Sequence, residues 1–462
     1  MQLEALKRIV GDIGWTDAPD RLAPQLAEWR GTWVGKTPLM LMPSSTQQVA
    51  SLVAECARQR IGIVPQGGNT GLCGGAIPDQ SGTQILLSLS RMNRLRSVSP
   101  DNFSMIAEAG CVLADLQRAA SEAGRVFPLS LAAEGSCQIG GNLSTNAGGI
   151  NVLRYGTARD QVLGLEVVLP DGSVINALRE LRKDTAGYDV KQLFIGSEGT
   201  LGIITAAALR LYPALPGIRT AMLAIDSPQR AIELLAFLRE HSLDQLQAFE
   251  LLSDTAMQFV LQYLDDARPP FSETSDWYVL LDIACNPGSS AVDELLMLAL
   301  EKSLVKDAVV AKNDREREQL WRIRHAVSAA QKQAGASLKH DVSVPVNAVG
   351  RFIEAATLAV EGECNGARVV AFGHVGDGNI HFNVSQPPGW EAARFLEARE
   401  QIGNRVYDIV AGFGGSFSAE HGVGVLKKAA LAHYRGAAEY ALMRTLKASL
   451  DPDNIMNPGK VL

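Results

Sequence analysis

Cysteine is scarce in this 462-residue chain, and its six copies are scattered. They form no CxxC pair and no cluster, which argues against an iron–sulfur centre and against a disulfide framework. Most of them are predicted to be small buried side chains in a reducing compartment. The sequence also lacks an apolar run of about 18 residues that could cross a bilayer. Its N-terminus has no signal-peptide core either, so we expect a cytoplasmic protein without a membrane span.

An excess of basic residues is missing as well. The formal net charge is −7 at pH 7, and acids are interleaved with Lys and Arg even in the charged stretch 313–318. Nucleic acid is therefore not expected as a partner. The chain has no GxGxxG that opens a helix after a strand, and it has no GxxxxGK[ST]. Neither a Rossmann dinucleotide site nor a P-loop NTPase is predicted.

Glycine, by contrast, is concentrated in three loops. A predicted strand at residues 61–64 runs into residues 65–72, PQGGNTGL, and similar loops follow at 140–149 and 196–202. Successive backbone N–H groups without Cβ obstruction can surround a pyrophosphate. One such loop is explained equally well by a tight turn, but three in one region favour a bound nucleotide. We expect this nucleotide in extended form between two subdomains.

A candidate metal site lies in residues 368–385, RVVAFGHVGDGNIHFNVS. Two β-prone runs flank Asp377-Gly378, which is a strong signal for a two-residue hairpin loop. With these residues as the loop, His374 pairs with His381, and their Cβ atoms lie about 5 Å apart. The two imidazoles are then close enough to bind one metal ion.

A third ligand is predicted in SAEHGVG, residues 418–424. Glu420 adds a carboxylate to His374 and His381, and two His with one Glu and an open position are typical of catalytic zinc. His421 is left as a candidate general base. Each histidine alone is more often an ordinary surface residue, so the hypothesis depends on the whole set. A hydrolase could use the same ligands, because a metal does not identify the reaction.

Helical signals open the chain. Residues 1–30 are amphipathic and are predicted to form an N-terminal helical arm. Ser45 and Gln48 have the spacing of a capping box, at the start of a helix that should end near Arg60.

The order of the later elements predicts two domains. Strand signals precede a Pro-rich linker near residue 215, at 162–169, 173–175 and 201–211. Beyond the linker, the chain repeats a β-α-β pattern, with strands at 220–225, 277–284 and 308–311 and helices at 228–241 and 290–303. This pattern predicts a ferredoxin-like α+β domain whose antiparallel sheet includes the hairpin of His374.

Cationic side chains gather around one further helix, predicted at residues 315–330. Arg324 and Ser328 lie four residues apart on one face of it, and Lys339 follows just beyond its end. Two cations and a hydroxyl are more than one metal-held carboxylate requires, so they suggest a second anionic group on the substrate. The alternative is a solvated surface on which the cations pair with Asp341 and other acids.

Six motifs, in order, resemble the FAD proteins of the vanillyl-alcohol-oxidase type. They are PQGGNTGL (65–72), GGNLSTNAGG with LRYG (140–156), GYDVKQLFIGSEGTLGIIT (187–205), GHVGDGNIHFN (373–383), SAEHGVG (418–424) and DPDNIMNPGK (451–460). Within this superfamily the chain resembles the FAD-linked D-2-hydroxyacid dehydrogenases, most closely those that act on D-2-hydroxyglutarate. The resemblance implies an α+β protein with a two-subdomain FAD-binding domain and a ferredoxin-like α+β domain for substrate and metal.

Domain boundaries follow from this resemblance. It implies the N-terminal arm at 1–30, the FAD-binding domain at 31–215, the substrate and metal domain at 216–425, and a segment at 426–462 that returns to the FAD-binding domain.

Roles for individual residues are implied as well. The residues that match metal ligands are His374, His381 and Glu420, for Zn²⁺ or alternatively Mn²⁺, and His421 matches the catalytic base. The residues expected to hold FAD are Pro65, Gln66, Gly67, Gly68, Asn69, Thr70, Gly71, Leu72, Ser136, Gly140, Gly141, Asn142, Ser144, Thr145, Asn146, Gly148, Glu198, Gly199, Gly202, Ile203 and Asn457.

Substrate contacts match Arg324, Lys339 and Asn383. Ser328 stands where many members of the family have Thr, and it keeps the hydroxyl. Asn69 occupies the place of the histidine that carries covalent FAD in some members, so we expect FAD to be non-covalent. Because no iron–sulfur motif is present, the electrons should leave to a separate carrier such as an electron-transferring flavoprotein.

Several alternatives remain open at this stage. The substrate could be D-lactate or glycolate instead of D-2-hydroxyglutarate. A non-redox zinc hydrolase with purely structural glycine loops is a different class of function, and a colourless purified protein would support it. A flavin-carrying subunit of a larger complex is a third reading, and a homodimer is an open assembly state.

Overall fold

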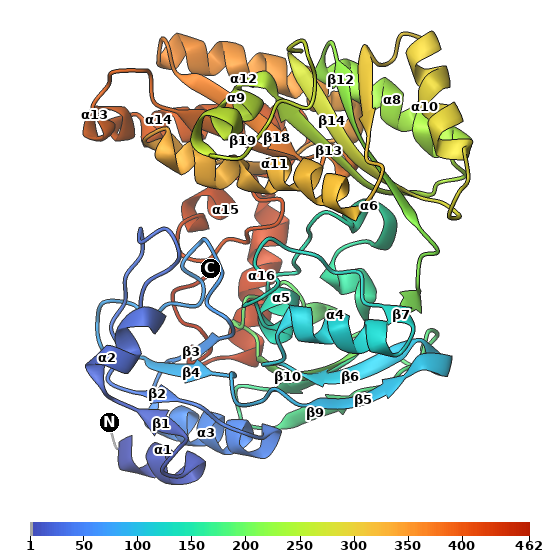
Figure 1. Cartoon of the computed structure of the whole chain (residues 1–462). Coiled ribbons are helices and arrows are strands. Elements are labelled where there is room, and N and C mark those ends of the chain that lie inside the picture. Colours follow the sequence, from blue (N-terminus) through green and yellow to red (C-terminus); the bar gives the residue numbers. More distant parts are fainter. Residues whose placement is uncertain (1–2) are drawn as a thin grey trace. The chain divides into compact units, whose positions relative to one another are not determined.

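The computed structural model describes residues 3–462, and the chain divides into two compact units (Figure 1). Unit 1 consists of the residues up to 148 together with residues 155–214 and 420–462, and unit 2 consists of residues 149–154 and 215–419. Unit 1 is therefore assembled from three stretches of chain. Met1 and Gln2 of the predicted arm lie outside the described residues.

The first sheet of unit 1 packs against helix α3 (Thr46–Gln59), whose N-cap is Ser45. Its strands lie in the order β1-β2-β4-β3, with bounds β1 (Trp15–Thr16), β2 (Met40–Leu41), β3 (Ile63–Gln66) and β4 (Ile85–Ser88). Helix α3 (Thr46–Gln59) ends at Arg60, as predicted. Half of the predicted capping box is present, because Ser45 Oγ accepts from the Gln48 N–H, whereas Gln48 Oε1 accepts from the Ser44 N–H.

Residues 3–30 are not helical throughout, contrary to the prediction. Helix α1 (Leu3–Val10) ends at Gly11, whose φ of +70° suits glycine at the end of a helix. Strand β1 follows and pairs with β2, and α2 (Pro19–Leu22) is a single turn. Leu6 is fully buried in the same core as α3, so this segment belongs to the packed interior of unit 1.

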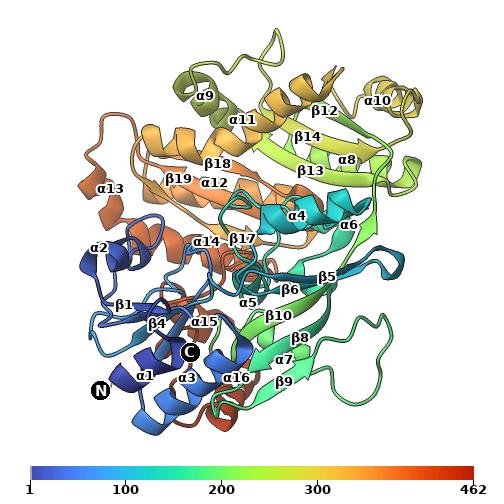
Figure 2. The same cartoon turned by 60° about the horizontal axis from the view of Figure 1, so that its bottom comes forward.

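A second, antiparallel sheet completes unit 1, and its strands lie side by side in Figure 2. Their order is β5-β6-β10-β8-β9, with bounds β5 (Leu95–Ser99), β6 (Ser104–Glu108), β8 (Val162–Val168), β9 (Val174–Ala177) and β10 (Ile203–Arg210). The hairpin and the strand predicted between 162 and 211 are confirmed. Smaller elements of unit 1 are α4 (Leu113–Glu122), β7 (Arg125–Val126), α5 (Ile139–Ser144), α7 (Lys191–Phe194) and β11 (Tyr212–Pro213). Helix α6 (Val152–Tyr155) lies mostly in residues 149–154, which belong to unit 2.

The last stretch of unit 1 adds α15 (Lys428–Tyr434), α16 (Ala437–Leu450) and a turn-rich tail. Met456 forms a parallel bridge with Ile63 of β3. Asp451 stabilises the tail, because its two carboxylate oxygens accept the N–H groups of Ile455 and Met456 at 2.9 and 2.8 Å.

Unit 2 is built on one antiparallel sheet of eight strands. Seven of them lie in the order β15-β12-β14-β13-β18-β19-β16, and β17 also pairs with β19. Their bounds are β12 (Ile218–Ile225), β13 (Leu246–Ser253), β14 (Trp277–Ala284), β15 (Asp307–Val310), β16 (Ser337–Leu338), β17 (Asp341–Ser343), β18 (Arg368–Gly373) and β19 (Asn379–Ser385). The hairpin of His374 belongs to this sheet, as predicted. The sequence missed β13, because all eight of its residues are buried and it therefore shows no alternation.

Helices cover both faces of this sheet, in agreement with the α+β prediction. One face packs against α8 (Pro228–His241), α10 (Ala291–Glu301), α12 (Val349–Glu363) and α14 (Arg399–Gly412), with the short α13 (Ala392–Glu397) beside them. The opposite face packs against α9 (Asp254–Tyr263) and α11 (Asp314–Gln333). Helix α11 is capped by Asn313, whose side chain accepts the Glu316 N–H, and it carries two of the predicted substrate residues, Arg324 and Ser328.

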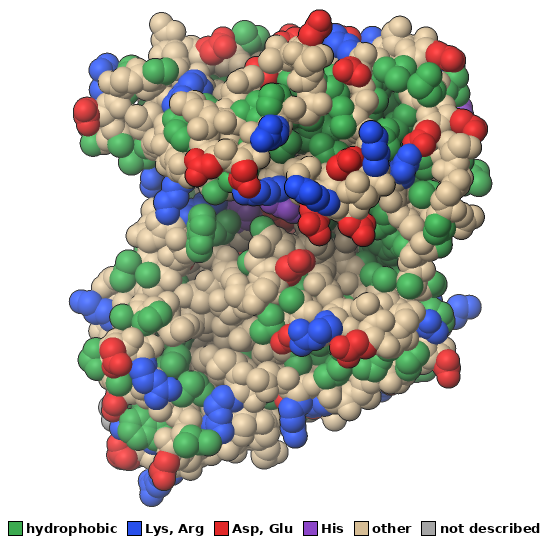
Figure 3. All heavy atoms as spheres, in the orientation of Figure 1, with side chains coloured by type: hydrophobic (Ala, Val, Ile, Leu, Met, Phe, Trp, Pro, Cys, Tyr) green, Lys and Arg blue, Asp and Glu red, His purple; other side chains and the backbone are tan. Residues whose placement is uncertain are grey.

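None of the six cysteines forms a disulfide, and five of them are buried. Within residues 3–462 there is no helix both long and apolar enough to cross a membrane. Lys and Arg side chains are interspersed with Asp and Glu on the faces of both units that Figure 3 shows.

Candidate active site

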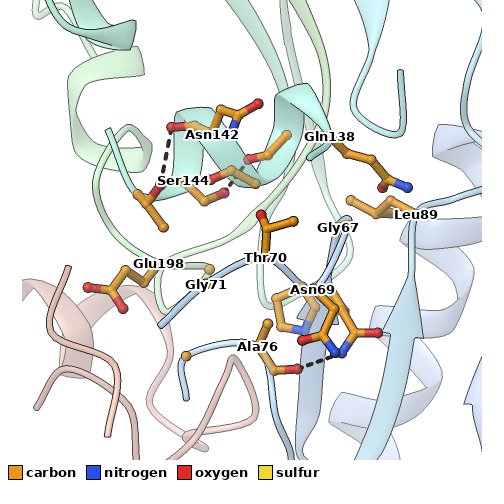
Figure 4. A pocket seen from close by; sticks show the side chains of 18 of the residues that line it. Gly67, Asn69, Thr70, Gly71, Ala76, Leu89, Gln138, Asn142, Ser144 and Glu198 are labelled. Atoms are coloured by element: carbon orange, nitrogen blue, oxygen red, sulfur yellow. Dashed lines mark hydrogen bonds between the residues drawn. The ribbon is translucent and has the colours of Figure 1, made fainter. Parts of the chain in front are cut away.

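The three glycine loops line one cavity of about 870 Å³ in unit 1 (Figure 4). Every residue predicted to hold FAD lines it except Ser136, Asn146, Gly148 and Asn457. The sequence did not predict the other lining residues, which are Cys73, Gly75, Ala76, Leu89, Gln138 and His421.

Backbone geometry explains why glycine is needed in the first loop. A Cβ atom on Gly68 would lie 2.0 Å from the Ser136 carbonyl oxygen, so the loop can approach residue 136 only without a side chain. Gly71 and Gly141, in contrast, would direct a Cβ atom into open space. Because both of them line the cavity, side chains there would occupy the ligand's volume.

Buried acceptors in the cavity fit a ligand that is rich in hydrogen-bond donors. Gln66 Oε1, Gln138 Oε1 and Asn142 Oδ1 are buried without a hydrogen-bond partner. The amide of Gln66 is fixed in this orientation, because its Nε2 donates to the carbonyl oxygens of Gln25 and Ala76 at 2.9 and 3.0 Å. The hydroxyl and N–H groups of FAD are suitable donors for such acceptors. The residues present therefore fit FAD.

Glu198 fixes the segment that follows His421. Its carboxylate accepts the N–H groups of Val423 and Gly424 at 2.7 and 2.8 Å, and burial raises the pKa of this group against the effect of those two donors. The first glycine loop is tied to the same segment, because the Val425 N–H donates to the Cys73 carbonyl oxygen at 2.8 Å. His421 lines the cavity as a result of these contacts.

The hairpin of unit 2 has a different register from the predicted one. His381 lies opposite Phe372, whereas the sequence predicted that it would lie opposite His374. The prediction was wrong because the loop is longer than Asp377-Gly378. It begins after Gly373, at φ +143°, and includes a 3-10 turn at residues 375–377. The imidazoles of His374 and His381 are nevertheless neighbours, with ring centroids 5.6 Å apart.

Two carboxylates that were not predicted as neighbours of these histidines lie beside them. Glu250 Oε1 lies 2.5 Å from Nδ1 of His374, and Asp341 Oδ1 lies 3.7 Å from Nδ1 of His381. Asp341 faces His381 across the pairing of β17 with β19. Glu250 could have been noticed as a lone acid in the apolar run AFELL, since an isolated buried carboxylate needs a partner.

Glu420 and His421 directly follow the last residue of unit 2 in the chain, Ala419. The Ala419 N–H donates to the Asp341 carbonyl oxygen at 3.3 Å, and Glu420 is the next residue along the chain. Both Glu420 and His421 belong to unit 1, and Glu420 Oε1 lies 3.9 Å from Nε2 of His421.

The candidate substrate residues of unit 2 are arranged along α11 and the strands beside it. Arg324 is buried, and Ser328 is exposed one turn further along the helix. Gln331, which the sequence analysis missed, is fully buried, and its Oε1 accepts from Lys339 Nζ and, at 3.0 Å, from Asn383 Nδ2. Gln331 thus holds both of these residues.

Comparison with known proteins decides the family. One family model, described as the FAD binding domain, matches residues 37–178, and another, described as the C-terminal domain of FAD linked oxidases, matches residues 216–461. The mitochondrial D-2-hydroxyglutarate dehydrogenase of Arabidopsis thaliana is 37% identical over 99% of this chain and 80% of its own length. The corresponding protein of Bos taurus is 39% identical over 100% of this chain and 83% of its own length. The chain belongs to the D-2-hydroxyglutarate dehydrogenase family of FAD-linked oxidases.

This FAD-linked oxidase is thus an FAD-dependent dehydrogenase, as the motifs predicted. Its fold also agrees with solved structures. p-Cresol methylhydroxylase superimposes with a TM-score of 0.79 at 16% identity, covering 99% of this chain and 96% of that protein. The predicted vanillyl-alcohol-oxidase-type fold is confirmed.

Proposed function

We propose that this FAD-linked oxidase converts a D-2-hydroxy acid to the 2-oxo acid, and that its substrate is D-2-hydroxyglutarate. The observation that supports this substrate most is the position of Arg324 next to the imidazole pair. Its guanidinium carbon lies 4.9 Å from the ring centroid of Phe372, and that ring lies 4.9 Å from His381. Only the ring of Phe372 lies between Arg324 and His381 along this path. The cation is thus placed to bind the distal carboxylate of a dicarboxylic acid whose 2-hydroxyl end lies at the metal site.

His374, His381 and Glu420 are the residues that would hold the metal. Imidazole and carboxylate suit both Zn²⁺ and Mn²⁺, and a carboxylate behind a ligating His, as Glu250 is behind His374, is a regular feature of such sites. A bound Zn²⁺ supplies a Lewis acid that lowers the pKa of the 2-hydroxyl. Asn383 and Lys339, held by Gln331, together with Ser328, complete the proposed substrate contacts.

His421 acts as the base in this proposal. The substrate loses a hydride from C2 and a proton from its 2-hydroxyl, and the imidazole of His421 takes the proton. Bound FAD supplies the acceptor for the hydride. The cavity loops hold FAD without a covalent bond, since Asn69 is an amide whose Nδ2 donates to the Ala27 carbonyl oxygen at 3.1 Å. Electrons then leave to a separate carrier protein. We place the protein in the cytoplasm, because cysteines that form no disulfides are typical of a reducing compartment.

Anaerobic bleaching of the flavin tests the function directly. The purified protein should be yellow, and D-2-hydroxyglutarate should bleach it with a higher kcat/KM than D-lactate, glycolate or L-2-hydroxyglutarate. A preference for D-lactate would assign the protein to the monocarboxylate alternative. A colourless protein that binds no added FAD would contradict flavin chemistry altogether.

The distal carboxylate can be tested on Arg324. One hydrogen bond to a charged group is worth about 2 kcal/mol, which corresponds to roughly a thirty-fold change in kcat/KM. Arg324→Ala should therefore lower kcat/KM for D-2-hydroxyglutarate far more than for D-lactate. The ratio between the two acids is the quantity to measure, because the variant also removes the partner of Glu250 and affects both substrates through that change.

Lys339→Ala provides a second test of this site, because Lys339 lies outside α11 and its Nζ donates to Gln331 Oε1. It should change the ratio in the same direction. Equal losses for both acids in both variants would contradict the assignment of a dicarboxylate.

A further inference from the structure

Glu250 is a fully buried carboxylate in the middle of β13. Its Oε1 lies 2.5 Å from Nδ1 of His374, and its Oε2 accepts from Nε of Arg324 at 2.6 Å. Each carboxylate oxygen thus serves one partner, and the two partners come from different elements, the β18–β19 loop and α11.

The same two partners are also connected on their other side. The guanidinium of Arg324 lies over the ring of Phe372, 4.9 Å from its centroid. Phe372 in turn lies 4.9 Å from His381, and His381 lies 5.6 Å from His374, measured between ring centroids. Glu250 therefore closes a ring of contacts within unit 2 that includes two proposed metal ligands and the proposed carboxylate-binding arginine.

We propose that Glu250 is a positioning residue that holds His374 and Arg324 at once and thereby couples the metal site to the site of the distal substrate carboxylate. This inference rests on the proposed function for the roles of His374 and Arg324. Because one carboxylate holds both residues, a change at Glu250 affects both sites. Coupling of this kind is reciprocal, so metal and distal carboxylate should change each other's affinity by the same factor.

The chemistry of the two hydrogen bonds explains why a carboxylate is required. His374 must donate from Nδ1 to keep its lone pair on Nε2 for a metal, and Arg324 can only donate. Both partners therefore need an acceptor, and an ionised carboxylate offers two. A glutamine at this position has one acceptor oxygen and one NH₂ group, so in either orientation it faces one of the two donors with another donor.

Glu250→Gln is the decisive variant, to be studied as the FAD-loaded full chain. We expect its affinity for Zn²⁺, measured by competition with a chelator in the absence of substrate, to fall about 10- to 100-fold. The preference for D-2-hydroxyglutarate over D-lactate in kcat/KM should fall in the same variant. A residue that only supported the fold would lower stability without changing both quantities.

Asp282→Asn is the matched control. Asp282 is a buried carboxylate on the neighbouring strand β14, and it binds Arg317 of the same helix α11 at 2.9 Å, together with Thr220 and Trp321. The control removes an equally buried charge that has no contact with the imidazole pair. It should lower the melting temperature and leave both the Zn²⁺ affinity and the substrate preference unchanged.

Three results separate the possible failures. If His374→Ala keeps the Zn²⁺ affinity of the wild type, the proposed metal site is wrong. If His374→Ala loses Zn²⁺ while Glu250→Gln keeps both its Zn²⁺ affinity and its substrate preference, the role of Glu250 is wrong. If Glu250→Gln does not fold, Glu250→Asp replaces it. This variant keeps the charge but is too short to reach both partners, and an unchanged Zn²⁺ affinity in it would overturn the proposal.

Discussion

Replacement of His421 by alanine is expected to lower kcat by about 10²- to 10⁴-fold, the usual cost of removing a general base. The reason for choosing His421 is structural, since its imidazole lines the cavity formed by the glycine loops. The backbone that follows it is fixed by Glu198 and Cys73, so the substitution should leave this segment in place. Turnover of D-2-hydroxyglutarate is the first measurement, and bound FAD and metal content should match the wild type.

His433→Ala is a suitable control for this variant. His433 is an exposed histidine on α15, in the same stretch of unit 1, and its ring packs against that of Tyr434 with the centroids 4.6 Å apart. Its removal should not change kcat.

If His421→Ala loses the metal while Glu420→Ala keeps it, the roles of ligand and base have to be exchanged between these two residues.

Replacement of His374 or His381 by alanine is expected to remove both the metal and the activity while FAD stays bound. Both histidines belong to unit 2, whereas all the residues of the glycine-loop cavity belong to unit 1. Losing one of three proposed ligands leaves too few donors for a catalytic site. Metal content after gel filtration and the flavin absorbance of the same sample are the two measurements.

An exposed histidine of unit 2 serves as the control here. His241 lies at the end of α8, where its Nδ1 contacts the Phe237 carbonyl oxygen at 2.9 Å. His241→Ala should keep metal, flavin and activity. If His374→Ala or His381→Ala lost the flavin together with the metal, the histidines would have a folding role, and the proposed metal site would be refuted.

The cavity loops could be predicted from the sequence because their chemistry is local. A strand that runs into glycines creates exposed backbone N–H groups whatever the rest of the chain does, and residues 65–72 line the cavity as such a loop should. Helix α11 was predicted to within a few residues for the same reason, since its capping and its periodicity are contained in its own sequence.

Long-range pairing was much less predictable. The register of the β18–β19 hairpin depends on a 3-10 turn at residues 375–377, and the Asp-Gly signal of a two-residue loop hides that turn. Strand β13 is buried on both faces, so it lacks the alternation that identifies a strand. Glu250, the residue that connects His374 with Arg324, lies on that missed strand. Its two partners are 124 and 74 positions away in the sequence, so only the folded structure shows these contacts.

The interrupted course of unit 1 has a consequence for synthesis. Its third stretch, residues 420–462, carries His421 and the Met456 bridge to β3, and the whole of unit 2 precedes it in the chain. A ribosome therefore releases the glycine loops from its exit tunnel long before the segment that completes their cavity. Domains commonly fold in the order in which they emerge, but here unit 2 has its entire sequence available first. A nascent chain that stalls before residue 420 carries the first and second stretches of unit 1 without the histidine that lines its cavity, so the cavity can be completed only after unit 2 has been synthesised.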